Sequence, residues 1–234
     1  MKRKTDTGYN ERLFSSGLRK QLHQARFLWI HKKLVEVKGP CDRVVELGCF
    51  DGKVIEYLPE PPRRYLGFDA DWEGALSLAR ERWKDHPAYE FRYCTTPDEM
   101  DLGDDRFDIA IAMETLEHVP DHLVGPYLAK LAAATDRYLL VTAPNEIGAV
   151  FFFKYLIKLF FGEVERHSWS EFVNATLGRT DRIRRGHHKG FDYRWLIRLI
   201  AEHFEIVEIS ALPFSSLPTS LSFTVGILAR PKRA

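Results

Sequence analysis

Short apolar segments alternate with segments of helical periodicity along most of this chain, and this alternation restricts its fold more than any other feature. The segments with strand character are runs of five to seven residues, at 43–48, 65–69, 89–94, 107–112, 138–142, 204–209 and 223–229. The segments with helical spacing lie at 19–37, 53–58, 72–83, 120–134 and 193–203. A strand, a helix and a second strand in succession form a parallel pair with a crossover helix. The pattern therefore predicts an α/β fold with a mostly parallel sheet and helices on both faces.

The end of the chain departs from this alternation. No helical pattern separates the last two predicted strands, so we expect them to pair antiparallel. A long stretch, 146–190, also separates the fifth predicted strand from the last helix. Connections in such folds are usually about two to six residues long, so this stretch is predicted to be a helical insertion.

Composition and charge exclude several classes of protein. The 234 residues carry 34 Lys and Arg against 33 Asp and Glu, a formal net charge of +1. A dedicated binder of duplex DNA usually has a marked basic excess, so DNA is not an expected partner. Three widely spaced cysteines suit a reducing compartment. The basic N-terminus has no apolar core behind it, and lysines interrupt the longest apolar run, so we expect neither a secretory signal nor a spanning helix. These features predict a cytoplasmic protein.

Acidic residues and glycines gather where the first two predicted strands end. Glu46, Gly48 and Gly52 follow one another after the first strand, and the second strand ends in Asp69. The two glycines permit a tight turn and a close approach of the backbone to a ligand. A carboxylate at the position of Asp69 can accept hydrogen bonds from both hydroxyls of a ribose. Because ligands of open parallel sheets bind beyond the carboxyl ends of the strands, these residues predict a nucleoside site.

Two cofactors could occupy such a site. A dinucleotide requires the pattern Gly-x-Gly-x-x-Gly, which, counted from Gly48, needs glycines where the chain has Phe50 and Lys53. S-adenosylmethionine has no phosphate, but its amino group and its sulfonium are cationic and favour a carboxylate such as Glu46. The sequence therefore favours S-adenosylmethionine as the cofactor.

With these motifs the chain resembles the class I S-adenosylmethionine-dependent methyltransferases, in particular the ubiquinone-biosynthesis O-methyltransferase-like (methyltransferase type 11/12) group. The resemblance is carried by VVELGCFDG at 44–52, YLGFDAD at 65–71, FDIAIAMETLEHVPD at 107–121 and YLLVTAPN at 138–145. It implies a Rossmann-like sheet of seven strands with an antiparallel last strand. It also implies a single methyltransferase domain over 1–234, composed of an N-terminal helical segment (1–40), a cofactor-binding core (41–145), an insertion or lid (146–190) and a C-terminal helix and strand pair (191–234).

The resemblance further implies which residues hold the cofactor. Glu46 and Gly48 would bind the methionine end, Asp69 would bind the ribose, and Ala70 would lie beside the adenine. Met113 and Glu114, at the end of the fourth strand, would close over the cofactor. The predicted cofactor-binding residues are Glu46, Gly48, Cys49, Gly52, Asp69, Ala70, Met113 and Glu114. The family usually has a glycine where this chain has Phe50, a side chain that would narrow or cap the turn.

Glu114, Glu117 and His118 form a second cluster, just after the fourth predicted strand. On a helical turn, residues three and four apart share a face, and carboxylates with an imidazole can bind a divalent metal. The cluster is similar to the metal site of the small-RNA 3′-terminal 2′-O-methyltransferases, which also includes a later histidine. In this chain, that later ligand would be His187 or His188. In other methyltransferases with a similar Glu–His pair, the histidine is a base or only packs. The sequence leaves all three roles open.

The favoured reaction is methyl transfer to an oxygen of a small-molecule or lipid-linked acceptor. Such a transfer needs the acceptor proton to be removed, and histidine, which titrates near neutral pH, suits that role. The candidate catalytic residues are His118, Glu117 and His188, and no metal ligand is assigned. One alternative is a metal-dependent RNA ribose 2′-O-methyltransferase, against which the near-zero charge argues. Another is a non-catalytic cofactor-binding module.

The predicted insertion begins with a segment, 147–161, that has six aromatic residues and only two charges, Lys154 and Lys158. A basic run with two histidines follows at 179–189. One interpretation is a core helix followed by a solvated loop. The other is a helix that lies on the inner face of a membrane, with the basic groups near anionic headgroups. The ubiquinone-biosynthesis O-methyltransferases have a similarly placed insertion, which implies a lid for a lipid-linked acceptor. A homodimer through the same apolar surface is the competing explanation.

Overall fold

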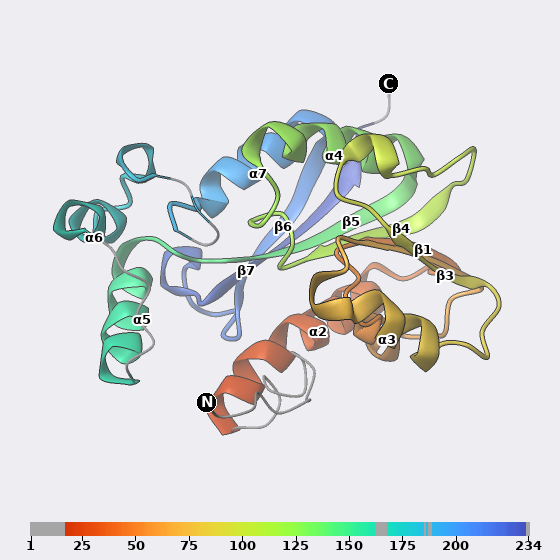
Figure 1. Cartoon of the computed structure of the whole chain (residues 1–234), viewed down its shortest axis with the longest axis horizontal. Helices are drawn as coiled ribbons and strands as arrows, with labels where there is room; N and C mark the ends of the chain where they lie inside the picture. Colours follow the sequence, from red (N-terminus) through yellow and green to blue (C-terminus); the bar gives the residue numbers. More distant parts are fainter. Residues whose placement is uncertain (1–16, 162–167, 185, 187–188, 233–234) are drawn as a thin grey trace.

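The computed structural model describes residues 17–161, 168–184, 186 and 189–232, and these contain one sheet of seven strands (Figure 1). The strand order is β3-β2-β1-β4-β5-β7-β6. The strands are β1 (Arg43–Leu47), β2 (Arg64–Asp69), β3 (Tyr89–Tyr93), β4 (Phe107–Met113), β5 (Thr135–Pro144), β6 (Phe204–Leu212) and β7 (Thr224–Pro231). The first five strands pair parallel, whereas β7 runs antiparallel to both β5 and β6. The predicted Rossmann-like α/β class, with its antiparallel last strand, is confirmed.

Helices cover both faces of the sheet (Figure 1). The helices are α2 (Gly17–Val37), α3 (Ala75–Arg82), α4 (Asp121–Ala134), α5 (Gly148–Phe161), α6 (Trp169–Thr176) and α7 (Tyr193–His203). One face of the sheet packs against α4 and α7, and the other packs against α2 and α3. A parallel sheet needs this double cover because its strands are apolar on both sides.

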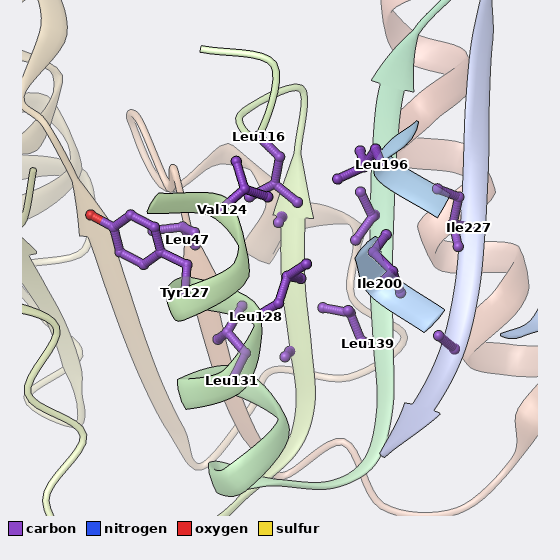
Figure 2. Packing of buried hydrophobic residues seen from close by; sticks show 14 of the residues in the cluster. Leu47, Leu116, Val124, Tyr127, Leu128, Leu131, Leu139, Leu196, Ile200 and Ile227 are labelled. Carbon is purple, nitrogen blue, oxygen red and sulfur yellow. The ribbon is translucent and has the colours of Figure 1, made fainter. Parts of the chain in front are cut away.

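The larger apolar cluster lies between the sheet and the helices α4 and α7. Figure 2 shows Val124, Leu128 and Leu131 of α4 on the face that points toward the strands, with Leu139 among the strand residues that they meet. These α4 positions are spaced by three and four residues, as expected for the buried stripe of a helix. From α7, Leu196 contributes to the same cluster.

On the other face, α2 is attached by apolar and ionic contacts. Phe27, Ile30 and Leu34 are buried in the second cluster, and Lys33 forms an ion pair of 2.8 Å with Glu208 of β6. The predicted helix at 19–37 therefore exists and packs against the sheet. Its buried face brings the first half of the helix toward the carboxyl ends of the strands, where Arg26 lies 3.8 Å from Glu114.

Two element predictions need correction. The segment predicted as a helix at 53–58 is a short 3₁₀ helix, Lys53–Tyr57, because the prolines that follow leave too few residues for an α-helix to propagate. The strand predicted at 138–142 runs from Thr135 to Pro144. Pro144 is accommodated as the last residue of that strand, where the ladder ends.

The insertion leaves the sheet after β5 and forms α5 and α6 at one end of the molecule (Figure 1). Phe151 of α5 packs on Phe172 of α6, with ring centroids 5.9 Å apart. Within the described residues, no helix combines the length and the apolar character that a membrane span requires. The predicted helical insertion after the fifth strand is therefore observed, and its first helix lies at the surface.

Candidate functional site

The turn after β1 is shaped by contact with the loop after β4. Gly48 has φ 78°, and a Cβ built on it would lie 2.0 Å from Oγ1 of Thr115. The backbone N–H groups of Gly48 and Cys49 both donate to the carbonyl of Phe68 in β2, at 2.7 and 3.0 Å. The turn thus brings together the carboxyl ends of β1, β2 and β4, as the strand order requires.

Glu46 is buried at the end of β1, with 1% of its surface exposed. The hydroxyl of Tyr65, on the neighbouring strand β2, donates a hydrogen bond to its carboxylate. Burial raises the pKa of Glu46 to about 8, although the bond from Tyr65 acts in the opposite direction. Nearby Asp69 and Asp51 raise this pKa further. A cationic ligand at this point would favour the ionised form of Glu46.

Asp69, at the end of β2, is held by a cradle of backbone N–H groups. Phe50 donates to Oδ2 at 3.0 Å and Asp71 donates to Oδ1 at 2.8 Å, and the backbone of Trp72 also contributes. Burial raises the pKa of Asp69 from its ordinary value, whereas these N–H groups lower it. Each carboxylate oxygen has two lone pairs, so the cradle leaves acceptor capacity for the hydroxyls of a ribose.

The other predicted cofactor residues lie around the same edge in different environments. Cys49 is buried, with its sulfur against Gly67 of β2. It therefore contributes its backbone, and not its side chain, to the ligand-facing side of the turn. Gly52 closes the turn above the ring of Trp83. Ala70 is exposed after Asp69, and Met113 is partly buried at the end of β4. The structure therefore places all these backbones at the carboxyl edge of the sheet.

Glu114 faces a cation that the sequence motifs did not reveal. Its Oε2 lies 3.8 Å from Nη1 of Arg26, and both side chains are largely buried. Within the described part of the chain, Oε1 of Glu114 and Nε of Arg26 are buried and form no hydrogen bond. A buried donor and a buried acceptor without such bonds are costly unless a ligand or a water satisfies them. An amino-acid group, with its ammonium and its carboxylate, has the complementary donors and acceptors.

The expected helical turn from Glu114 to His118 is not formed. Glu114 has φ 51°, which is left-handed and incompatible with a helix, and α4 begins only at Asp121. Consequently Glu117 points inward and is fully enclosed, whereas the side chain of His118 is 45% exposed. Nε2 of His118 lies 3.9 Å from Oε1 of Glu117. Burial, and then the negative charge of Glu114, raises the pKa of Glu117 well above its ordinary value.

A metal site does not emerge from the described residues. No group of three or more His, Cys, Asp and Glu side chains among them could hold a metal ion. The proposed later ligands, His187 and His188, lie outside the described residues.

The start of the insertion is attached to this edge through Lys154, whose contacts the sequence motifs did not indicate. Nζ of Lys154 in α5 contacts the carbonyl of Asn145 at 2.9 Å, Glu146 at 3.0 Å and the carbonyl of Phe223 at 3.2 Å. Lys154 is therefore bound within the protein and does not reach toward headgroups, as the membrane interpretation of the basic groups in the insertion would require. Its ammonium group is bound by these two carbonyls and by the carboxylate of Glu146.

Arg26 was also missed, but the sequence holds a signal for it. It lies four residues after Leu22 and four before Ile30, on the apolar stripe of the predicted helix. A charged residue on such a stripe must reach a buried partner or a ligand, because burying it alone is costly. A charged residue on the apolar stripe of a helix is therefore the sequence signal that marks Arg26 as a candidate site residue.

Comparison with known proteins finds similarity to methyltransferases. Residues 44–137 match the family model described as a methyltransferase domain. The ubiquinone biosynthesis O-methyltransferase of Bradyrhizobium diazoefficiens is 30% identical over 142 residues, which cover 56% of this chain and 52% of that protein. The chain thus spans about half the length of the curated relatives it matches.

Solved structures share the fold across almost the whole chain. A S-adenosylmethionine-dependent methyltransferase from Clostridium acetobutylicum has a TM-score of 0.66 at 11% identity, covering 96% of this chain and 99% of its own. The magnesium protoporphyrin IX methyltransferase of Synechocystis, solved with bound S-adenosylhomocysteine, has a TM-score of 0.58 at 17% identity, covering 95% and 92%. At these identities the similarity establishes the fold, including the C-terminal strand pair that lies outside the family match.

Proposed function

We propose that this chain, whose residues 44–137 match a methyltransferase domain, is a class I S-adenosylmethionine-dependent methyltransferase that transfers a methyl group to an oxygen of a small-molecule or lipid-linked acceptor. The observation that carries the proposal is the pair of buried carboxylates, Glu46 and Asp69, at the ends of adjacent strands beside a turn that only glycine can make. This arrangement suits a cationic nucleoside and not a pyrophosphate.

The residues at this edge match the polarity of the proposed cofactor. Asp69, fixed by its backbone cradle, would accept the ribose hydroxyls. Glu46 and Glu114 would face the ammonium and the sulfonium, and Nε of Arg26 would donate to the carboxylate. When bound, S-adenosylmethionine supplies a methyl group on a positively charged sulfur, which makes that methyl electrophilic. Positioning of the acceptor behind this methyl supplies most of the rate.

His118 is the proposed base. Its exposed imidazole follows β4 at the same edge as the cofactor residues, and it neighbours the buried carboxyl of Glu117. In this role the imidazole accepts the hydroxyl proton of the acceptor as the new bond to carbon forms. Glu117 would help to orient the imidazole, and His188, outside the described residues, stays a sequence-based candidate for the rim of the acceptor site.

Oxygen is the proposed accepting atom because the curated relatives are named O-methyltransferases of ubiquinone biosynthesis.

A lipid-linked acceptor is supported by the surface next to the site. Phe153, Leu156 and Leu159, which we call the outer face of α5, are exposed at spacings of three residues on a helix tied to the carboxyl edge through Lys154. Exposed apolar side chains grouped in this way mark an interaction surface.

We also propose that the outer face of α5 lies on an anionic membrane surface. Phe153 is 60% exposed, and Trp169 at the start of α6 is 80% exposed. Arg179, Arg182 and Arg184 follow α6 with exposed side chains. Aromatic residues beside arginines fit the boundary between acyl chains and anionic headgroups, where each basic residue contributes about 1 kcal/mol.

Mass spectrometry can test the proposed reaction directly. Lipid and metabolite extracts are incubated with the purified chain and with S-adenosylmethionine labelled with ¹³C at its methyl group. We expect an acceptor to gain one labelled methyl on a hydroxyl oxygen. The labelled product should be found in the lipid extract or in the extract of small metabolites. A labelled methyl found only on nitrogen or carbon would overturn the assignment to oxygen, and no labelled product from any extract would contradict the proposed activity.

A further inference from the structure

Two aromatic rings project from the backbone cradle that holds Asp69. Phe50 and Trp72 both contribute backbone N–H groups to that carboxylate, one from the turn after β1 and the other from the segment after β2. Their ring centroids are 6.2 Å apart, with the ring planes inclined by 49°. Trp72 is 58% exposed, so most of its indole surface is accessible beside the carboxylate. An apolar surface of this size next to a ribose-binding carboxylate fits a planar base.

The backbone at Phe50 and on both sides of Trp72 is left-handed, a conformation that residues other than glycine seldom adopt. Phe50 has φ 46°, Asp71 has φ 58° and Glu73 has φ 55°. These are three of the five non-glycine residues with positive φ in the described part of the chain. Left-handed backbone of this kind gathers at segments that clamp ligands, because the surrounding structure must hold it in place. Glycine would adopt the backbone conformation at position 50 with less strain than phenylalanine. The backbone conformation therefore does not account for the phenylalanine at this position.

We infer that Phe50 and Trp72 form an aromatic clamp on the adenosyl group of the cofactor, with the purine stacked on the indole and the phenyl ring covering the ribose side. This inference rests on the proposed function, which supplies the adenosyl ligand. Ala70, which follows Asp69 directly, has only a methyl group to place against a purine. The clamp supplies the apolar surface that this position lacks.

Binding measurements with two ligands test the clamp. Calorimetry with S-adenosylhomocysteine, and competition by adenosine alone, are carried out on the wild type, Trp72→Ala, Trp72→Phe and Phe50→Gly. Stacking of a base on an aromatic side chain corresponds to about five- to one hundredfold in affinity. Trp72→Ala is expected to lose affinity in this range for both ligands, and Trp72→Phe to retain most of it.

Phe50→Gly separates a ligand contact from a structural role. Glycine suits φ 46°, so the free energy of unfolding should stay the same or rise while the affinity for S-adenosylhomocysteine falls about fivefold or more. Leu78→Ala, which shortens an exposed apolar side chain of α3, is the control and should leave both affinities unchanged.

Each remaining outcome decides against one of the two proposals. If the wild type binds S-adenosylhomocysteine and both Trp72→Ala and Phe50→Gly bind it within twofold of the wild type, the clamp is wrong and the proposed function stands. A loss of affinity for S-adenosylhomocysteine without a loss for adenosine would also overturn the clamp, because it would place the effect at the amino-acid end. Failure of the folded wild type to bind either ligand would contradict the proposed function itself.

Discussion

The hydroxyl of Tyr65 donates a hydrogen bond to the carboxylate of Glu46 on the adjacent strand, and both side chains are enclosed by the protein. The bond does not compensate for the loss of water around a negative charge, so the pKa of Glu46 stands at about 8. At neutral pH the ligand-free chain therefore holds Glu46 mostly in its protonated form. The carboxyl of Glu46 therefore lies at the cofactor edge in its protonated form, and a bound cation would favour its ionised form.

Glu46→Gln should change how stability depends on pH. The unfolded chain loses the Glu46 proton near pH 4.5, whereas the folded chain keeps it until about pH 8. Between these values the folded state binds more protons, so this residue lowers the free energy of unfolding by up to about 1.4 kcal/mol for each unit that the pH rises. Glutamine has no proton to lose. Urea unfolding at pH 5.5 and pH 8 should show the variant gaining stability over the wild type as the pH rises, and a pH-independent difference would contradict the assignment.

Cofactor binding should release a proton from Glu46. An ammonium or sulfonium beside the carboxyl favours its ionised form and lowers its pKa. Near pH 7 the binding heat for S-adenosylhomocysteine should therefore depend on the ionisation enthalpy of the buffer, with a different heat in Tris from that in phosphate. The affinity should rise between pH 6 and pH 8. In Glu46→Gln the buffer dependence should be much reduced, and equal heats in both buffers for the wild type would show that Glu46 does not respond to the ligand.

His118→Ala should reduce turnover and leave cofactor binding intact. A base near the reacting hydroxyl contributes about 10²–10⁴-fold to the rate, and the side chain of His118 is 45% exposed, where an acceptor can reach it. The comparison uses initial rates of labelled methyl transfer and calorimetric affinities for S-adenosylhomocysteine. His122→Ala, at an exposed histidine of α4, is the control and should keep its rate. A full rate in His118→Ala would remove this residue from the mechanism.

The outer face of α5 should bind anionic vesicles. In co-sedimentation, the wild type should pellet with vesicles that contain phosphatidylglycerol and should stay in solution with phosphatidylcholine alone. Replacing Phe153 and Leu159 together by serine should abolish the pelleting. Leu78→Ser, which changes an exposed apolar side chain on α3, should not affect it. If the double variant instead converts a dimer to a monomer without changing lipid binding, the face is an interface between two copies of the chain.

The order of elements and the cofactor edge could be predicted from the sequence because both follow from local patterns. Continuous apolar runs marked the buried parallel strands, and Asp69 ended the second of them. Asp192 lies directly before the helical pattern at 193–203, and its side chain accepts a hydrogen bond from the backbone N–H of Arg194 as the N-cap residue of α7. Such features depend on neighbours a few residues away, so spacing alone reveals them.

Features that depend on packing between distant segments were missed or misjudged. The ion pair of Arg26 with Glu114 joins residues 88 positions apart, and neither residue type predicts the other. The left-handed backbone at Glu114 separates it from the turn that holds Glu117 and His118, which spacing had placed on one helical face. Lys154 turned inward because backbone carbonyls of two separate segments converge on its amino group. A pattern of charges along one helix cannot show such convergence.

Calorimetric titration of S-adenosylhomocysteine into the wild-type chain and into Asp69→Asn tests the central claim most directly. The amide keeps the size of the side chain but removes the charge and one acceptor that the ribose hydroxyls would use, so the account predicts saturable one-site binding that weakens about tenfold or more in the variant. Asp136→Asn, at an exposed carboxylate at the opposite edge of the sheet, should bind like the wild type. Equal binding by Asp69→Asn, or no heat from the folded wild type at millimolar ligand, would contradict the account.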